Sequence, residues 1–75
     1  MTKQELLQRL QDEKVPENCY SLEGGLPNDR LCLEKLGLAW LVYYSETGER
    51  YEEMFFTSED EACDYFHTRV KEMTT

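Results

Sequence analysis

Hydrophobic and polar residues follow a helical period at the two ends of the chain and a strand-like alternation between them. Near the start, Leu6, Leu7 and Leu10 recur at the spacing of one helix face. Proline lacks the backbone N–H that a helix interior needs, so Pro16 predicts that this first helix ends by about Lys14. The pattern therefore predicts an amphipathic helix at the beginning of the chain.

The end of the chain shows a second helical pattern. Its apolar stripe consists of Ala62, Phe66, Val70 and Met73. Each helix begins with the spacing of a capping box, Thr2 with Glu5 in the first and Ser58 with Glu61 in the second. We expect these pairs to fix where the two helices start.

The middle of the chain alternates between apolar and polar residues, which is the period of a half-buried strand. Four segments have strand character: 19–22, 31–34, 38–45 and 50–56. Turn residues separate them, at 24–29 (GGLPND), at Gly37 and at Thr47 with Gly48. The short turns predict that the last three strands are antiparallel neighbours.

The order of these elements predicts an α+β fold in which residues 1–75 form a single domain. We expect an antiparallel three- to four-stranded meander sheet, with the N- and C-terminal helices packed on one face. Alternation assigns six side chains to the covered face: Leu31, Leu33, Trp40, Val42, Met54 and Phe56. It directs four others away from the helices: Leu41, Tyr43, Tyr51 and Phe55.

Charge is distributed unevenly along the chain. The net charge is −8, and segment 46–64 holds eight acidic residues and one basic residue, so it carries seven of the eight net negative charges. Nucleic acids and anionic membranes repel such a surface, whereas a basic protein attracts it. Because tyrosine is enriched at interfaces, we predict a partner-binding surface that consists of Tyr43, Glu46, Glu49, Tyr51, Glu52, Glu53, Glu59, Asp60 and Asp64. The alternative interpretation is a solvated face that maintains solubility.

Residue types that carry chemistry are few and scattered. Cys19, Cys32 and Cys63 include no close pair, which argues against a disulfide framework and against a metal or redox site. His67 shares a helix face with Cys63, but that thiol falls on the buried side, where a cysteine is usually inert. We therefore expect no catalytic residue, no metal, no cofactor and no enzymatic activity. Since no apolar run follows Met1, we expect no signal peptide or transmembrane helix, and a cytoplasmic location.

Four segments carry a resemblance to a known family: 20–28 (YSLEGGLPN), 31–33 (LCL), 40–48 (WLVYYSETG) and 56–63 (FTSEDEAC). They resemble the corresponding parts of small immunity proteins from bacterial polymorphic toxin systems. The resemblance implies that the protein binds a cognate toxin domain in the cytoplasm and blocks it. Such toxins are often nucleases with basic clefts, which an acidic inhibitor suits. The family transfers no catalytic residues, so the binding surface above comes from the charge argument alone.

The leading hypothesis is thus a non-enzymatic immunity protein whose partner is a basic toxin domain. We expect it to bind neither nucleic acid nor a membrane. The alternative is an adaptor or subunit of a larger assembly, which self-associates as a homodimer or pairs with another chain through a sheet edge. A third hypothesis, a small hydrolase that uses Cys63 and His67, depends on whether the thiol is accessible.

Overall fold

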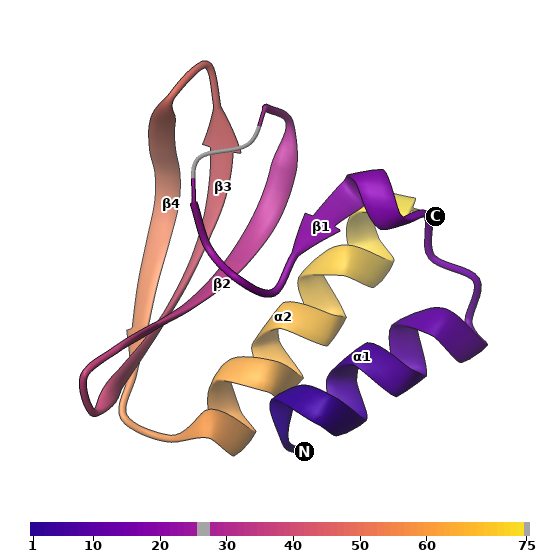
Figure 1. Ribbon diagram of the computed structural model, residues 1–75, viewed down its shortest axis with the longest axis horizontal. Helices are drawn as coiled ribbons and strands as arrows, with labels where there is room; N and C mark the ends of the chain where they lie inside the picture. The colour runs from indigo at the N-terminus through magenta and orange to yellow at the C-terminus, as the bar shows by residue number, and fades with distance from the viewer. Residues whose placement is uncertain (26–27, 75) are drawn as a thin grey trace.

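The computed structural model describes residues 1–25 and 28–74, which form two helices and a four-stranded sheet (Figure 1). In chain order the elements are α1 (Lys3–Asp12), the 3-10 turn η1 (Glu17–Cys19), β1 (Tyr20–Ser21), β2 (Arg30–Leu36), β3 (Ala39–Glu46), β4 (Glu49–Phe56) and α2 (Glu59–Thr74). The α+β class that the sequence predicts is confirmed.

The sheet is mixed, with strand order β1-β2-β3-β4. β2, β3 and β4 form the predicted antiparallel meander, but β1 runs parallel to β2 and pairs Tyr20 with Leu31. The expectation of a fully antiparallel sheet is therefore wrong. Eight residues separate β1 from β2, more than the two residues of a tight hairpin turn, so the sequence between them does not require the two strands to be antiparallel. The turn predicted at 24–29 includes Leu26 and Pro27, which lie outside the described residues.

Side-chain caps begin both helices where the sequence predicts. The Oγ1 of Thr2 accepts a hydrogen bond from the backbone N–H of Glu5 at 3.1 Å, and the Glu5 carboxylate accepts the N–H of Thr2 at 3.0 Å. At the start of α2, the Oγ of Ser58 accepts the N–H of Glu61 at 3.3 Å. These bonds satisfy N–H groups that the first turn of a helix leaves unpaired, so each cap fixes its helix start.

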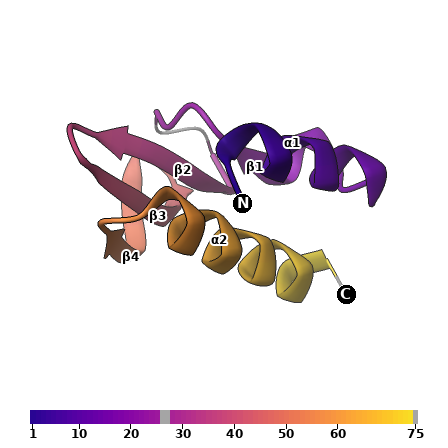
Figure 2. The same ribbon diagram turned by 90° about the horizontal axis from the view of Figure 1, so that it is seen from below.

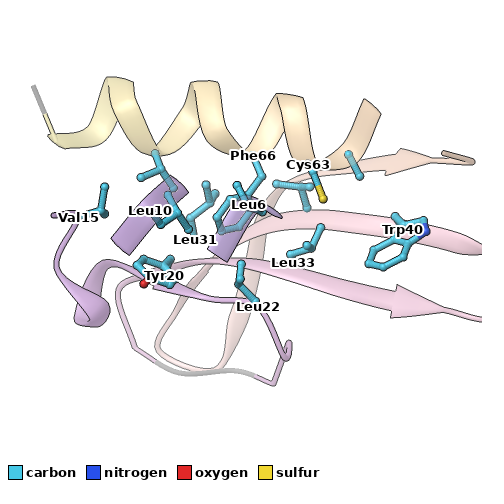
Figure 3. Close-up of a cluster of buried hydrophobic side chains, with 13 residues drawn as sticks. Leu6, Leu10, Val15, Tyr20, Leu22, Leu31, Leu33, Trp40, Cys63 and Phe66 are labelled. Carbon is cyan, nitrogen blue, oxygen red and sulfur yellow. The ribbon is translucent and has the colours of Figure 1, made fainter. Parts of the chain in front are cut away.

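One buried cluster joins both helices to one face of the sheet. Leu6 and Leu10 of α1, Phe66 of α2, and Leu31 and Leu33 of β2 all belong to it and are at most 2% exposed (Figure 3). Burial of each such side chain stabilises the fold by about 1.5–3 kcal/mol. The two helices lie side by side where they approach the sheet (Figure 2). We call the sheet face that they cover the inner face, and the opposite one the outer face.

The side chains predicted to face the helices are buried on the central strands but only partly covered on the edge strand β4. Trp40 and Val42 of β3 are buried there, and Phe56 of β4 packs against the cluster. Met54 shares this face but is 43% exposed, because β4 is the last strand and the core lies over its neighbours.

Candidate functional site

The edge strand β4 is the most exposed strand of the sheet. Seven of its eight residues are exposed, and Phe56 is half-buried. β3 flanks it on one side, and no strand within the described part of the chain flanks it on the other (Figure 1). Tyr51 is 42%, Met54 43% and Phe55 64% exposed. Because an edge strand also presents unpaired backbone N–H and C=O groups, β4 combines apolar contacts with free hydrogen-bonding groups.

A β-bulge at Glu52 interrupts β4. Two residues of β4 face Tyr43 of β3 there, and Glu52 has a φ of 54°, in the left-handed region. The extra residue shifts the alternation of side chains by one. Tyr51 therefore lies on the inner face with its partner Tyr44, whereas Phe55 lies on the outer face. The expectation that Tyr51 points away from the helices is wrong, because strict alternation takes no account of a bulge.

A shallow hollow of about 560 Å³ lies on the inner face, between the β3–β4 hairpin and the end of α2. Its lining consists of Tyr44, Glu46, Tyr51, Glu52, Arg69 and Met73. The Nη2 of Arg69 lies 2.5 Å from Oε2 of Glu52. The hydroxyl of Tyr51 donates to Glu49 at 2.8 Å, and this bond raises the pKa of Tyr51. The hollow thus brings together Glu46, Tyr51 and Glu52, but Arg69 neutralises Glu52.

Tyr43 is buried on the outer face, beneath the loop that joins β1 to β2. It has no exposed surface, and its hydroxyl lies 2.6 Å from the carbonyl oxygen of Gly25 and 2.8 Å from Oε1 of Glu34. The guanidinium of Arg50 lies 4.9 Å from the centre of the tyrosine ring and 3.6 Å from Glu34. Burial, and then the bond to Glu34, raise the pKa of the Tyr43 phenol. Tyr43 therefore supports the fold and does not belong to the surface that the sequence predicts.

The loop over Tyr43 depends on Gly24. This residue has a φ of 71°, and a Cβ at its position would meet the Glu34 carboxylate at 2.6 Å. The hydroxyl of Ser21 donates to the carbonyl of Gly24 at 3.1 Å. A larger residue at position 24 would be strained by its backbone conformation and would have to displace the Glu34 side chain, so glycine is favoured here.

The acidic residues at the start of α2 lie at the opposite end of β4 from the β3–β4 turn (Figure 1). The ammonium group of Met1 bonds to Asp60 and lies 3.8 Å from Asp64. Glu59 accepts the backbone N–H of Lys3 at 2.9 Å. The acidic stretch of the sequence is thus divided between two ends of the molecule, and the α2 group is bound to the N-terminal residues.

A coherent set of exposed residues remains on and beside β4. We call it the β4 surface; it consists of Glu46, Glu49, Tyr51, Glu53, Met54 and Phe55. Glu46 and Glu53 have no ion-pair partner among the described residues. Arg50, the one cation of this strand, turns to Glu34 on the outer face. The β4 surface therefore presents carboxylates and large apolar side chains together.

Sequence reasoning missed two members of this surface, Met54 and Phe55. Met54 was assigned to the core and Phe55 only to the uncovered face. Alternation states which face a side chain takes, but it does not state which strand lies at the edge. Met54 and Phe55 directly follow Glu52 and Glu53, and this run of acids and large apolar residues was the indication that the sequence offered.

A larger groove of about 690 Å³ lies where α1, β1 and the start of α2 meet. Its lining consists of Thr2, Lys3, Gln4, Leu7, Glu17, Tyr20, Ser21, Leu22, Glu23 and Glu59. The ammonium of Lys3 lies 2.8 Å from Oε1 of Glu23, so charges within this groove are partly paired. Of the residues predicted from sequence, it contains Glu59.

Cys63 and His67 lie on α2, where one is buried and the other pairs with Glu13. Cys63 is buried, which raises its pKa to about 11, so the thiol stays protonated at neutral pH. The Nε2 of His67 lies 2.9 Å from Oε1 of Glu13 and joins α2 to the end of α1. Cys19, Cys32 and Cys63 are free thiols. Within residues 1–25 and 28–74, no three His, Cys, Asp or Glu side chains are grouped to hold a metal ion.

Comparison of the chain with known protein families, with curated proteins and with solved structures finds no match. No helix in the described part of the chain is long and apolar enough to cross a membrane.

Proposed function

We propose that this chain is a non-enzymatic binding protein, an immunity protein that blocks a cognate toxin domain through the β4 surface. The main support is that one exposed strand sets Tyr51, Met54 and Phe55 beside the carboxylates of Glu49 and Glu53. Large apolar and aromatic side chains supply most of the binding energy of an interface. The charges around them select the partner and speed the encounter.

The sign of the charge points to a basic partner. The chain has a net charge of −8, and Glu46 and Glu53 are unpaired among the described residues. From Glu49 to Phe56, β4 spans about 23 Å at ~3.3 Å per residue. Electrostatic fields at physiological ionic strength decay over about 8 Å. Glu46 and Glu49 beside the hairpin and the acids at the start of α2 therefore act on different parts of a partner that docks along β4.

The kind of partner is proposed from the resemblance of segments 20–28 and 40–48 to small immunity proteins. Toxins of these systems are often nucleases with basic clefts, which an acidic inhibitor would fill. The protein would act in the cytoplasm, where it would meet the toxin. Binding of this kind requires neither metal nor cofactor.

The test is the association of the purified chain with the toxin domain encoded beside its gene. We expect a one-to-one complex, and we expect the double variant Glu49→Lys and Glu53→Lys to associate about tenfold more slowly, with a weaker dependence on salt. A matched control, Asp12→Lys with Glu17→Lys, makes the same change in net charge at exposed positions at the end of α1 and in η1, across the molecule from β4 (Figure 1). Equal rates for the two double variants would contradict the role of the β4 surface.

A second candidate is an adaptor or subunit that self-associates through β4. The free edge of the sheet favours it, because two edge strands can pair. Light scattering over a range of protein concentrations separates the two candidates. A strict monomer that binds one toxin domain counts against self-association, whereas a stable homodimer without toxin binding counts against the immunity role.

A further inference from the structure

Exposed apolar side chains stand on both faces of β4, beyond its bulge. Met54 pairs with Val42 of the inner cluster, so Met54 lies on the inner face. Phe55 pairs with Leu41, which is buried together with Cys32 and Tyr43 on the side of the sheet away from the helices. Phe55 therefore lies on the outer face. The two side chains are 43% and 64% exposed. A partner that rests on one face of the sheet could cover only one of them.

A strand added beyond β4 would flank both side chains at once, because its alternate residues point to the two faces. We therefore propose that the partner binds by β-strand addition, pairing its backbone with residues 53–56 of β4. This mode rests on the proposed function, since it states how the same surface holds its partner. The free backbone groups at the edge of β4 would supply the hydrogen bonds.

The bulge determines where the added strand lies. Glu52, with its φ of 54°, breaks the extended backbone between Tyr51 and Glu53. Because a bulge disrupts the ladder and bends the strand, one partner strand does not keep a single register across it. Residues 53–56 span about 10 Å of regular edge, at ~3.3 Å per residue. Residues 49–51, on the hairpin side of the bulge, would contact the partner through side chains only.

Charge determines which strand is accepted. Glu53 has no ion-pair partner among the described residues, and opposite charges on neighbouring strands are stabilising. A second copy of this chain would bring its own net charge of −8 and its own Glu49 and Glu53 to the same edge. Like charges on paired strands destabilise, so the expected occupant is an extended, mainly apolar segment of another protein that carries a basic residue opposite Glu53.

The experiment uses the full chain labelled with nitrogen-15 and a synthetic peptide of valines with a lysine at every fourth position, so that a lysine can lie opposite Glu53 while a valine lies opposite Phe55. Titration to about 1 mM peptide detects weak binding, and amide hydrogen exchange then reports which backbone groups become bonded. We expect alternate amides within residues 53–56 to exchange several-fold more slowly in the complex. A matched peptide that is N-methylated along one edge should lose binding, because it cannot donate those hydrogen bonds.

Two comparisons test the inference: one between variants of β4, and one between peptide binding and the exchange of the β4 amides. Phe55→Thr, which keeps a strand-forming residue, should weaken peptide binding several-fold, whereas Tyr51→Thr on the other side of the bulge should not. Equal losses would overturn the assignment to residues 53–56. Absence of binding at about 1 mM, or binding that depends on Glu53 but leaves the exchange of β4 amides unchanged, would overturn strand addition. The toxin-association rates still decide the proposed function independently.

Discussion

Glu52 has a left-handed backbone conformation, at φ 54°, within a strand that is otherwise extended. A residue with a Cβ incurs a cost of about 1–2 kcal/mol in this conformation. Glycine avoids that cost but loses about 0.5–1 kcal/mol of stability through its greater backbone freedom. Glu52→Gly and Glu52→Ala remove the same carboxylate and the same ion pair to Arg69. The glycine variant should therefore be more stable than the alanine variant by about 0.5–1 kcal/mol.

The next residue, Glu53, supplies the control. It lies outside the left-handed region and is exposed, so glycine there should be less stable than alanine by about 0.5–1 kcal/mol. The assay is urea unfolding of the four variants, compared by their midpoints and slopes. Opposite signs at the two adjacent positions would support the bulge. A glycine that is worse than alanine at both positions would refute the bulge, and with it the placement of Tyr51 on the inner face.

Two further predictions concern the outer face and the joint between the helices. Tyr43→Phe should lower the free energy of unfolding by about 1–2 kcal/mol, because it removes the hydroxyl bonded to Glu34; Tyr44→Phe is the control, and equal losses in urea unfolding would contradict the prediction. The hydrogen bond with His67 holds the pKa of Glu13 below its ordinary value of 4.5, so this carboxylate stabilises the fold above that pH and the contribution disappears as the pH falls. Glu13→Gln should therefore lose less stability than the wild type between pH ~6 and pH ~3, and parallel curves of stability against pH would disprove this.

The helix caps and the hairpin turn were predicted correctly, because each depends only on neighbouring residues. Thr2 and Ser58 cap the helices because their side chains meet N–H groups only three residues away. Gly48 follows Thr47 in a two-residue hairpin turn in which both have positive φ, so sequence and turn geometry agree. Each of these features depends on a few neighbouring residues, and the sequence therefore contains enough information to place them.

Features that depend on the meeting of distant segments were not predictable in this way. β1 pairs parallel with β2, and alternation gives the faces of a strand but not the direction in which it pairs. Tyr43 was correctly directed away from the helices, but the loop that covers it comes from a different part of the chain. The bulge at Glu52 changed the face of Tyr51, although no glycine marks the position. Two of these features, the burial of Tyr43 and the face of Tyr51, concern the candidate surface, because both depend on contacts or backbone geometry that alternation does not describe.

Exposed edge strands tend to pair with one another. The features of β4 that oppose such pairing also select which partner strand it accepts. A long, exposed edge with Met54 and Phe55 would favour pairing with another copy. The bulge at Glu52 shortens the regular edge, and Glu53 places a carboxylate within the part that remains. Both features oppose the pairing of two identical strands, since like charges would meet on a short ladder. The carboxylate does not oppose a strand that carries basic residues, because it attracts their charges. Resistance to self-association and selection of a basic partner can therefore come from the same few residues.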